Sequence, residues 1–492
     1  MRRSSHFRAA LLALMLGGCT ALGPDYETQP VSTQDEWTEA ENPLVDAEGA
    51  LDPRWWQLAF ADPVLDELVE RALQNNLTLR SAGLRVLQSE QQLAIAIGNQ
   101  YPQQQQISAS AQREQEKGSR VNDYNVGFNL AWEVDFWGRF QRQIESASAA
   151  LDTSVANYDE AMVSLVAQVA QSYLLLRTFQ DRLTIARENI KLQEESLRIA
   201  QAKLDAGDAS ELDVDQATSL LYSTRATVPA LEISLQQTKN ALALLLGESP
   251  QDFNKLAENM GVIPTSTPAV ALGMPQDLIR QRPDVRAAER QLAAQSAQIG
   301  FAVTELYPSF SIGGSIGSNA METDDLFSNE GEVWNIFGGF QWNVLNYGRL
   351  QSNVRLQDAR FQQLLVDYQF TVLQAQVDVE NSIVAYIKTH QQVKEYRRAE
   401  TAAQLAVDIS TAQYQDGLVD FNTVITNLNA LATQQDVLAS SRGAVATNLV
   451  QVYRSLGGGW QIRDNRDPVD LLPAEMKEAM KQRTKYWEGV LD

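Results

Sequence analysis

The sequence predicts a mainly helical chain that carries a small membrane-type β part and is built from two structural repeats. Three observations lead to this fold class. A segment from Gly138 to Gly247 returns as Gly348 to Gly457, at a constant offset of 210 positions. Residues 139–206 contain neither proline nor glycine, as a long helix requires. Short stretches before each long segment alternate apolar and polar residues with the period of two that is typical of strands.

The two copies agree at many positions in one register, which chance does not explain. Pairs at the offset of 210 include Trp132 with Trp342, Val134 with Val344, Tyr158 with Tyr368, and Leu246 with Leu456. The copies begin at an offset of 206, with Arg80 matching Arg286 and Tyr101-Pro102 matching Tyr307-Pro308. Internal repetition fixes the architecture, so we expect helix, β-hairpin, long helix and helix to occur twice.

The long helix of each copy is expected to pack on two sides. At about 1.5 Å per residue, residues 139–206 would extend for about 100 Å, which favours a coiled coil or a tube over a globular core. One apolar row has the spacing of a coiled-coil seam, and a second row runs beside it. The seam includes Leu151, Val155, Tyr158, Met162 and Leu165; the second row is Val163, Val166, Ala170 and Tyr173. An ordinary two-stranded coiled coil stays open as an alternative.

The chain begins with an export signal. Arg2, Arg3 and Arg8 precede an apolar stretch that is too short to span a bilayer. Leu16-Gly17-Gly18-Cys19 then resembles a bacterial lipobox, and Cys19 is the only cysteine, which rules out an intramolecular disulfide. We therefore expect Cys19 to be the acylated first residue of the mature chain.

The composition disfavours several classes of function. The net charge of −22 argues against nucleic acid as a partner. His6 and His390 are the only histidines, and no metal cluster, phosphate loop or Ser-His-Asp set is recognisable. We expect no enzymatic activity, no cofactor and no metal. The acidic balance is compatible either with solubility alone or with an interior that favours cations.

The strands predict assembly. The stretch from Tyr124 to Val134 is long enough for a tilted membrane strand, and its alternation returns between Trp334 and Val344, where Phe337 breaks the pattern. A weaker run follows Pro102, and residues 112–123 are expected to form a loop. Four strands per chain are too few, because single-chain membrane barrels use about eight or more. Three chains would give twelve strands and twelve long helices.

The ends of the two repeats and the proline-containing stretches between them define the predicted segments of the chain. The predicted segments are a leader (1–18), an acylated linker (19–61), a first repeat (62–247), an equatorial connector (248–276), a second repeat (277–460) and a C-terminal tail (461–492).

Several segments together resemble one known family, the outer membrane factors of tripartite efflux pumps, which are TolC-like tunnels, in the lipoprotein OprM/NodT branch. The segments are Cys19 to Tyr26, Trp55 to Val64, Gly273 to Glu289, Tyr307 to Ser309, Asn346 to Leu350 and Tyr414 to Phe421. The resemblance spans nearly the whole mature chain except the tail. It implies a homotrimer with a twelve-stranded β-barrel in the outer membrane of a Gram-negative bacterium and a twelve-helix α-barrel in the periplasm.

The function implied by the resemblance is passive conduction of small molecules such as drugs or other toxic compounds. The implied partners are a periplasmic adaptor (membrane fusion) protein, an inner-membrane pump of the RND type, and outer-membrane lipid. A structural or adhesin-like trimer, and a tunnel that secretes peptides or proteins, are the alternatives.

The resemblance also assigns roles to the two helical turns. The adaptor-docking tips would be Gly207, Asp208, Ala209, Gly417, Leu418 and Val419. The periplasmic aperture would be lined by Asp213, Asp215, Asn422, Thr423, Thr426 and Asn427. The second copy departs from the family pattern, because its aperture positions carry no acid. The glycines also have a structural role, since glycine after a helix end adopts positive φ without a Cβ penalty. Ser210 and Asp420 are expected to cap the returning helices.

Overall fold

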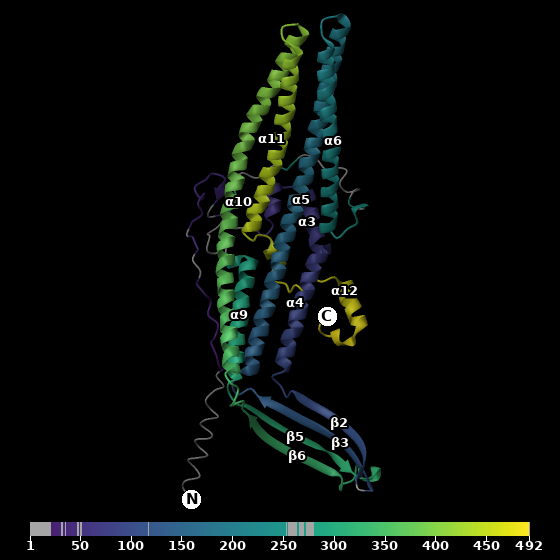
Figure 1. The fold of residues 1–492 in the computed structure, drawn as a ribbon, viewed down its shortest axis with the longest axis vertical. Coiled ribbons are helices and arrows are strands. Elements are labelled where there is room, and N and C mark those ends of the chain that lie inside the picture. Colours follow the sequence, from purple (N-terminus) through teal and green to yellow (C-terminus); the bar gives the residue numbers. More distant parts are fainter. Residues whose placement is uncertain are drawn as a thin grey trace. The chain divides into compact units, whose positions relative to one another are not determined.

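The chain divides into two compact units, which are described separately (Figure 1). Unit 1 contains Arg85–Ala156, Arg286–Phe370 and the first described residues; unit 2 contains Asn157–Val285, Thr371–Asp492 and the segment from 32 to 84. The leader, Cys19 and most of the predicted connector lie outside the described residues. The computed structural model describes residues 21–30, 33–34, 36–46, 49, 52–116, 118–251, 253, 263–264, 270–271 and 280–491.

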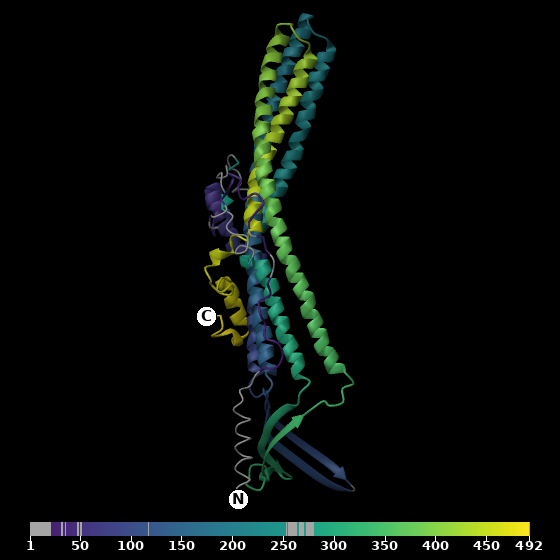
Figure 2. The same ribbon diagram turned by 90° about the vertical axis from the view of Figure 1, so that its left-hand side faces the viewer.

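Unit 1 contains one twisted, four-stranded antiparallel sheet (Figures 1 and 2). Its strands are β2 (Gln104–Glu116), β3 (Ser119–Val134), β5 (Ser309–Ala320) and β6 (Glu332–Gln341), in that spatial order. In the register, Phe128 lies opposite Ile107 on one side and Ile316 on the other, so the apolar side chains share a face. The predicted strands are confirmed, although the last one ends at Gln341 rather than at Val344.

Two details of the sheet differ from expectation. Residues 112–123 do not form a loop, because β2 continues to Glu116 and β3 starts at Ser119. Their backbone groups pair in register despite the polar side chains, from Gln112 opposite Asp123 outward. Phe337 has a packing reason: it lies opposite Gly313, and a Cβ on that glycine would come within 2.4 Å of its ring. The aromatic ring therefore covers the glycine on the polar face.

Four long helices follow the strands in the same order twice. These are α5 (Arg139–Ala206) with α6 (Glu211–Leu245), and α10 (Arg349–Gln415) with α11 (Phe421–Ser455). In unit 2 each pair forms an antiparallel hairpin, and the two turns lie at the same end (Figure 1). The prediction that residues 139–206 form one helix is confirmed.

The two hairpins meet where α5 packs against α11. The closest approach is at Gly443, where a Cβ would lie 2.1 Å from Thr178 Oγ1. Along the same line, Arg182 pairs with Asp436 at 2.7 Å and Asn189 donates to Gln435 at 2.8 Å. Only a residue without a side chain permits this distance between the helices.

The helical segment before the first hairpin is broken into two helices. α3 (Pro63–Asn75) and α4 (Leu77–Gly98) are separated by Asn76, whose Oδ1 accepts from Leu79 N at 2.9 Å. Asparagine competes with helix continuation by bonding the nearby backbone. Asp62 caps α3, because its carboxylate accepts from Val64 N at 2.9 Å. In the second copy, α9 (Pro283–Thr304) takes the corresponding place before β5.

The C-terminal tail is folded onto unit 2. It contains η3 (Trp460–Arg463), α12 (Ala474–Arg483) and η4 (Lys485–Trp487), with Leu472 packed against Gly83. Arg463 pairs with Asp159 of α5 at 2.9 Å, and that carboxylate is fully buried. Smaller elements of the unit are α2 (Trp55–Phe60) and the parallel pair β1 (Val45–Asp46) and β4 (Val270–Ala271). No described helix combines the length and the apolar character needed to cross a membrane.

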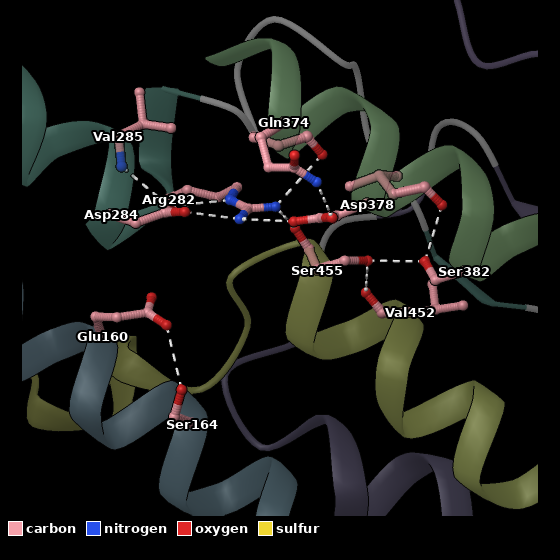
Figure 3. A network of polar contacts seen from close by, with 12 residues as sticks. Glu160, Ser164, Arg282, Asp284, Val285, Gln374, Asp378, Ser382, Val452 and Ser455 are labelled. Atoms are coloured by element: carbon pink, nitrogen blue, oxygen red, sulfur yellow. Dashed lines mark hydrogen bonds and ion pairs between the residues drawn. The ribbon is translucent and has the colours of Figure 1, made fainter. Parts of the chain in front are cut away.

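A polar network around the buried Arg282 joins α9, α10 and α11 in unit 2, and Glu160 of α5 lies nearby (Figure 3). The Arg282 guanidinium donates to both oxygens of Asp284, at 3.0 and 2.7 Å, and to the carbonyl of Ser455 at the end of α11, at 2.5 Å. Asp378 of α10 lies 3.7 Å from the same guanidinium. Glu160 of α5 accepts from Ser164 at 3.2 Å. Burial, and then the neighbouring Asp284 carboxylate, raise the pKa of Glu160, while Arg282 and Arg454 act in the opposite sense.

The raised pKa of Glu160 predicts that unit 2 becomes more stable in mild acid. A carboxyl whose pKa is higher in the folded chain binds a proton on folding, so stability rises as pH falls through that pKa toward the ordinary value of about 4.3. Glu160→Gln should unfold at a higher temperature than wild type at neutral pH and lose part of this pH dependence. Circular dichroism melts between pH 8 and 5 measure it, with exposed Glu188→Gln as control. An unchanged pH slope in Glu160→Gln contradicts the assignment.

Candidate functional site: the two helical turns

The turns after α5 and α10 have the same backbone geometry. Gly207 and Gly417 have φ values of 84° and 73°. The amides of Asp208 and Leu418 donate back to the carbonyls of Lys203 and Gln413, each at 2.8 Å. This pattern ends helices through a left-handed residue, and glycine adopts that conformation without a Cβ penalty. The predicted role of both glycines in the turns is therefore confirmed.

The caps of the returning helices differ between the copies. Asp420 accepts from the backbone N of Thr423 at 2.9 Å and from its Oγ1 at 2.8 Å. These bonds, the side-chain bond first, lower the pKa of Asp420. Ser210 occupies the cap position of α6 but makes no side-chain cap bond. Its hydroxyl donates to Asp213 at 3.1 Å, so the expectation of a capping serine was wrong.

An apolar cluster joins the two hairpins next to the turns. It draws on all four long helices, so neither hairpin end is packed only on itself. Val419 from the second turn packs against this cluster. Its buried members are Ala200, Ala217, Val407, Tyr414, Phe421, Val424, Leu428 and Leu431.

Tyr414 links the turns through polar contacts as well. Its ring lies 5.3 Å from the Lys203 ammonium and 4.9 Å from the Phe421 ring centroid. Its hydroxyl donates to Asp213 of α6 at 3.5 Å, a long hydrogen bond. Burial, followed by the charge of Asp213, raises the pKa of Tyr414 to about 12, so the hydroxyl keeps its proton at neutral pH. Tyr414 thus contacts both helices of the other hairpin.

The predicted aperture residues differ in exposure and in hydrogen-bond partners within the single chain. Asp213 is half-buried between Ser210 and Tyr414, and Asn427 donates to the Ala406 carbonyl at 3.3 Å. The hydroxyls of Thr423 and Thr426 bond to groups within α11 and its cap. Asp215 and Asn422 have exposed side chains. The structure therefore brings Asp213 to the second hairpin, and the lining of an aperture by these residues stays a prediction.

The predicted docking tips lie mostly on the surface. Gly207, Asp208, Gly417 and Leu418 are exposed, Leu418 by 72%, whereas Ala209 and Val419 are half-buried. A Cβ added to either glycine would meet no atom within 4 Å.

Sequence reasoning missed Tyr414 as the residue that connects the hairpins. A signal was present, because the 210-residue offset places Leu204 at the matching position of the first copy. The tyrosine in one repeat where the other has leucine marks a position at which the two repeats differ.

The turns offer exposed contact surfaces. In the described part of the chain, no group of three His, Cys, Asp or Glu side chains is arranged to hold a metal ion.

Comparisons with known proteins decide the family. The model of the family described as "Outer membrane efflux protein" matches residues 68–248 and 274–458, more than half of the chain. This chain belongs to the outer membrane efflux protein family. It is an outer-membrane channel protein of an efflux system rather than an enzyme, which confirms the function expected from the resemblance.

Relatives of this efflux protein agree over most of its length. It is 28% identical to the probable outer membrane lipoprotein SilC of Salmonella typhimurium, covering 92% of this chain and 99% of SilC. It is 32% identical to the pyoverdine export outer membrane protein OpmQ of Pseudomonas aeruginosa, covering 84% and 89%. The solved outer-membrane channel OprN superposes with a TM-score of 0.85 at 30% identity, covering 89% and 99%. The mainly helical fold with a small sheet is thereby confirmed.

The two caps of the efflux protein generate a paired prediction. Asp420→Ala removes the acceptor that satisfies the first turn of α11, so the amide of Thr423 and its neighbours should exchange several-fold faster. Ser210→Ala should leave the first turn of α6 nearly unchanged, because its hydroxyl does not cap. Hydrogen–deuterium exchange of both turns, read by mass spectrometry, compares them. Equal effects at the two turns would overturn the difference in capping.

Proposed function

We propose that three copies of this efflux protein form one tunnel that passively conducts small molecules from a periplasmic adaptor and an inner-membrane pump of the RND type across the outer membrane. The proposal takes 62–247 and 277–460 as structural repeats, joined by the connector 248–276 and flanked by the linker 19–61 and the tail 461–492. The observation that carries it is how the repeats pack. The residues through which α5 packs on α11 have equivalents in the other repeat, and those equivalents are exposed in the single chain.

The packing of α5 on α11 supplies this argument. Each residue of that contact has a repeat-related counterpart on α10 or α6, at the offset of 210. All of these counterparts are exposed in the single chain. The counterparts of Gln171, Thr178, Arg182 and Asn189 are Asn381, Lys388, Gln392 and Ala399, and those of Gln435, Asp436, Gly443 and Gln451 are Arg225, Ala226, Ile233 and Ala241. We infer that α10 packs on α6 of the next copy as α5 packs on α11.

The sheet supports the same assembly. β2 and β6 are its two edges, and each presents unpaired backbone groups along one side. Open edges are not tolerated in lipid, so β6 of one copy pairs with β2 of the next. Three copies close twelve strands, and cyclic symmetry is the usual form of closure. The exposed aromatic residues Trp334 and Phe340, at 69% each, then face lipid.

A cross-linking experiment tests the arrangement of copies. In the full chain, Gln392→Cys with Ala226→Cys should be joined between copies by a short bis-maleimide, giving linked dimers and trimers on a denaturing gel. The matched control is Arg182→Cys with Asp436→Cys, which lie together inside one chain and should give linked monomers only. A ladder that continues beyond three chains, or linked monomers from the first pair, contradicts the trimer.

The turns are the proposed contact with the adaptor. The exposed edges at Gly207–Ala209 and Gly417–Val419 give six similar surfaces in a trimer, and open space around both glycines leaves room for a helix to approach closely. The aperture is proposed at the same end, where Asp213, Asp215, Asn422, Thr423, Thr426 and Asn427 follow the turns. Contact of Tyr414 with Asp213 holds the hairpins together there. The pump, rather than the tunnel, selects the exported compound.

Bulky substitution at the turns should separate channel formation from export. Gly417→Trp, and Gly207→Trp in parallel, should leave trimers and single-channel conductance in planar bilayers intact, with a local backbone penalty of about 1 kcal/mol or more. Export in cells should be abolished, because the indole blocks docking. Gly489→Trp is the control, since Gly489 has a similar φ of 76° and open space on the tail. Wild-type export by both turn variants refutes the docking assignment.

Lipidation of Cys19 is proposed on the lipobox and on the similarity to SilC, a probable outer membrane lipoprotein. Mass spectrometry of the purified N-terminal peptide should give acylated Cys19 as the first residue. Cys19→Ser should still form trimers, because the shared sheet holds the protein in the membrane by itself. An unmodified thiol at Cys19 in the wild-type protein rejects the proposal.

A further inference from the structure

The first described residues of the chain are held by one buried arginine in unit 1. The side chain of Arg142, on α5, is only 3% exposed. Its Nε donates to the Leu22 carbonyl at 3.0 Å, and its Nη2 donates to the Gly23 carbonyl at 3.2 Å and to Asp25 Oδ1 at 2.9 Å. Nη1 bonds to Glu145 at 2.7 Å, which fixes the guanidinium from the other side. A single cation thus binds the backbone and a side chain of the same short segment.

Three glycines let this segment lie against the helices. Gly23 has a φ of 91°, and a Cβ there would lie 2.3 Å from the Cα of Gly300 on α9. A Cβ on Gly300 would collide with Arg142 at 2.7 Å, and one on Gly138 would collide with Ala21 at 2.5 Å. Each close approach requires glycine at that position. The segment therefore has a seat built from α5, α9 and the corner between β3 and α5.

The repeat shows that the seat exists once per chain. In the second repeat of the same chain, the position matching Arg142 is Ser352, at the offset of 210. In the first repeat, the position matching Gly300 is Ala94, at the offset of 206. Neither counterpart can make the corresponding contact. The seat thus departs from the internal repetition where an unrepeated segment, the N-terminal one, is bound.

The seat lies beside an aromatic cluster at the base of the sheet. Leu22 N donates to the Trp137 carbonyl at 3.0 Å. The Trp137 ring contacts Phe136 and Tyr307, with centroids 4.7 and 4.9 Å apart, and its Nε1 donates to the Pro308 carbonyl at 2.8 Å. Aromatic residues of this kind collect at the membrane–water interface. In the sequence, only Thr20 separates Cys19 from Ala21.

We propose that residues 21–26 form a latch and that Arg142 is the positioning residue that fixes the lipid-bearing end of the mature chain at the aromatic base of the sheet. The placing of the lipid rests on the proposed acylation of Cys19; the latch itself does not, because its contacts involve residues 21–26 only. Within one chain, the latch also connects α5 of the first repeat to α9 of the second repeat. Tyr26 extends this tie, since its hydroxyl donates to Glu289 of α9 at 3.4 Å.

Brief digestion of the full-length trimer in detergent with proteinase K, followed by intact mass measurement, tests the latch. Wild type should keep its complete N-terminal segment, whereas Arg142→Ala should lose it at least roughly tenfold faster, because local opening exposes backbone to cleavage. Ser352→Ala, the repeat-related control, should behave as wild type. Gly23→Val prevents the segment from lying against Gly300 and leaves the residues of α5 and α9 unaltered. It should therefore show the same faster cleavage, and it replaces Arg142→Ala if that variant fails to assemble.

Repeating the digestion in Cys19→Ser separates this inference from the proposed function. The segment should stay protected without the lipid, and Arg142→Ala should release it in that background too. Equal cleavage of wild type and Arg142→Ala, or of wild type and Gly23→Val, overturns the latch. Wild-type export by both turn variants, or an unmodified Cys19, would count against the proposed function while leaving the protection of residues 21–26 as it is.

Discussion

The fold depends on one constraint: helices of nearly seventy residues carry two neighbouring apolar rows, so each needs a packing partner along both rows. Inside the chain α5 meets this requirement with α6 and α11, down to the contact of Gly443 with Thr178. The second copy leaves the matching surface of α10 exposed, with Phe370 exposed by 63% and Leu373 by 58%. Burying such side chains contributes about 1.5–3 kcal/mol each, which makes a lone chain an incomplete structure.

Three buried arginines connect distant parts of the chain. Arg142, Arg282 and Arg463 are all buried, in a protein with 62 acidic residues. Each binds a carboxylate together with at least one backbone carbonyl, the arrangement in which a planar guanidinium satisfies several acceptors at once. Two of the three hold segments outside the repeated part, the N-terminal segment and the tail. Most of the acidic excess stays at the surface, where water solvates it.

Periodicity sufficed to predict the long helices and the four strands, because both signals repeat over many residues. It placed α5 at its observed limits and identified Gly207 and Gly417 as the residues that end helices. The remaining features depend on single side-chain choices that no period encodes. Ser210 had two partners within reach and bonds Asp213 instead of the helix backbone. Tyr414 contacts Asp213 only when the two hairpins come together, because the two residues are 201 positions apart in the sequence.

The pairing of Arg463 with Asp159 has a consequence for how the protein is made. The two residues are 304 positions apart, and Asp159 is completely buried once the tail is in place. A chain that emerges from its N-terminus carries this carboxylate long before its partner arrives, and an isolated charge is expensive to bury. Asp159 can therefore pair with Arg463 only once the tail has been made, so the burial of this part of α5 depends on the last thirty or so residues of the chain.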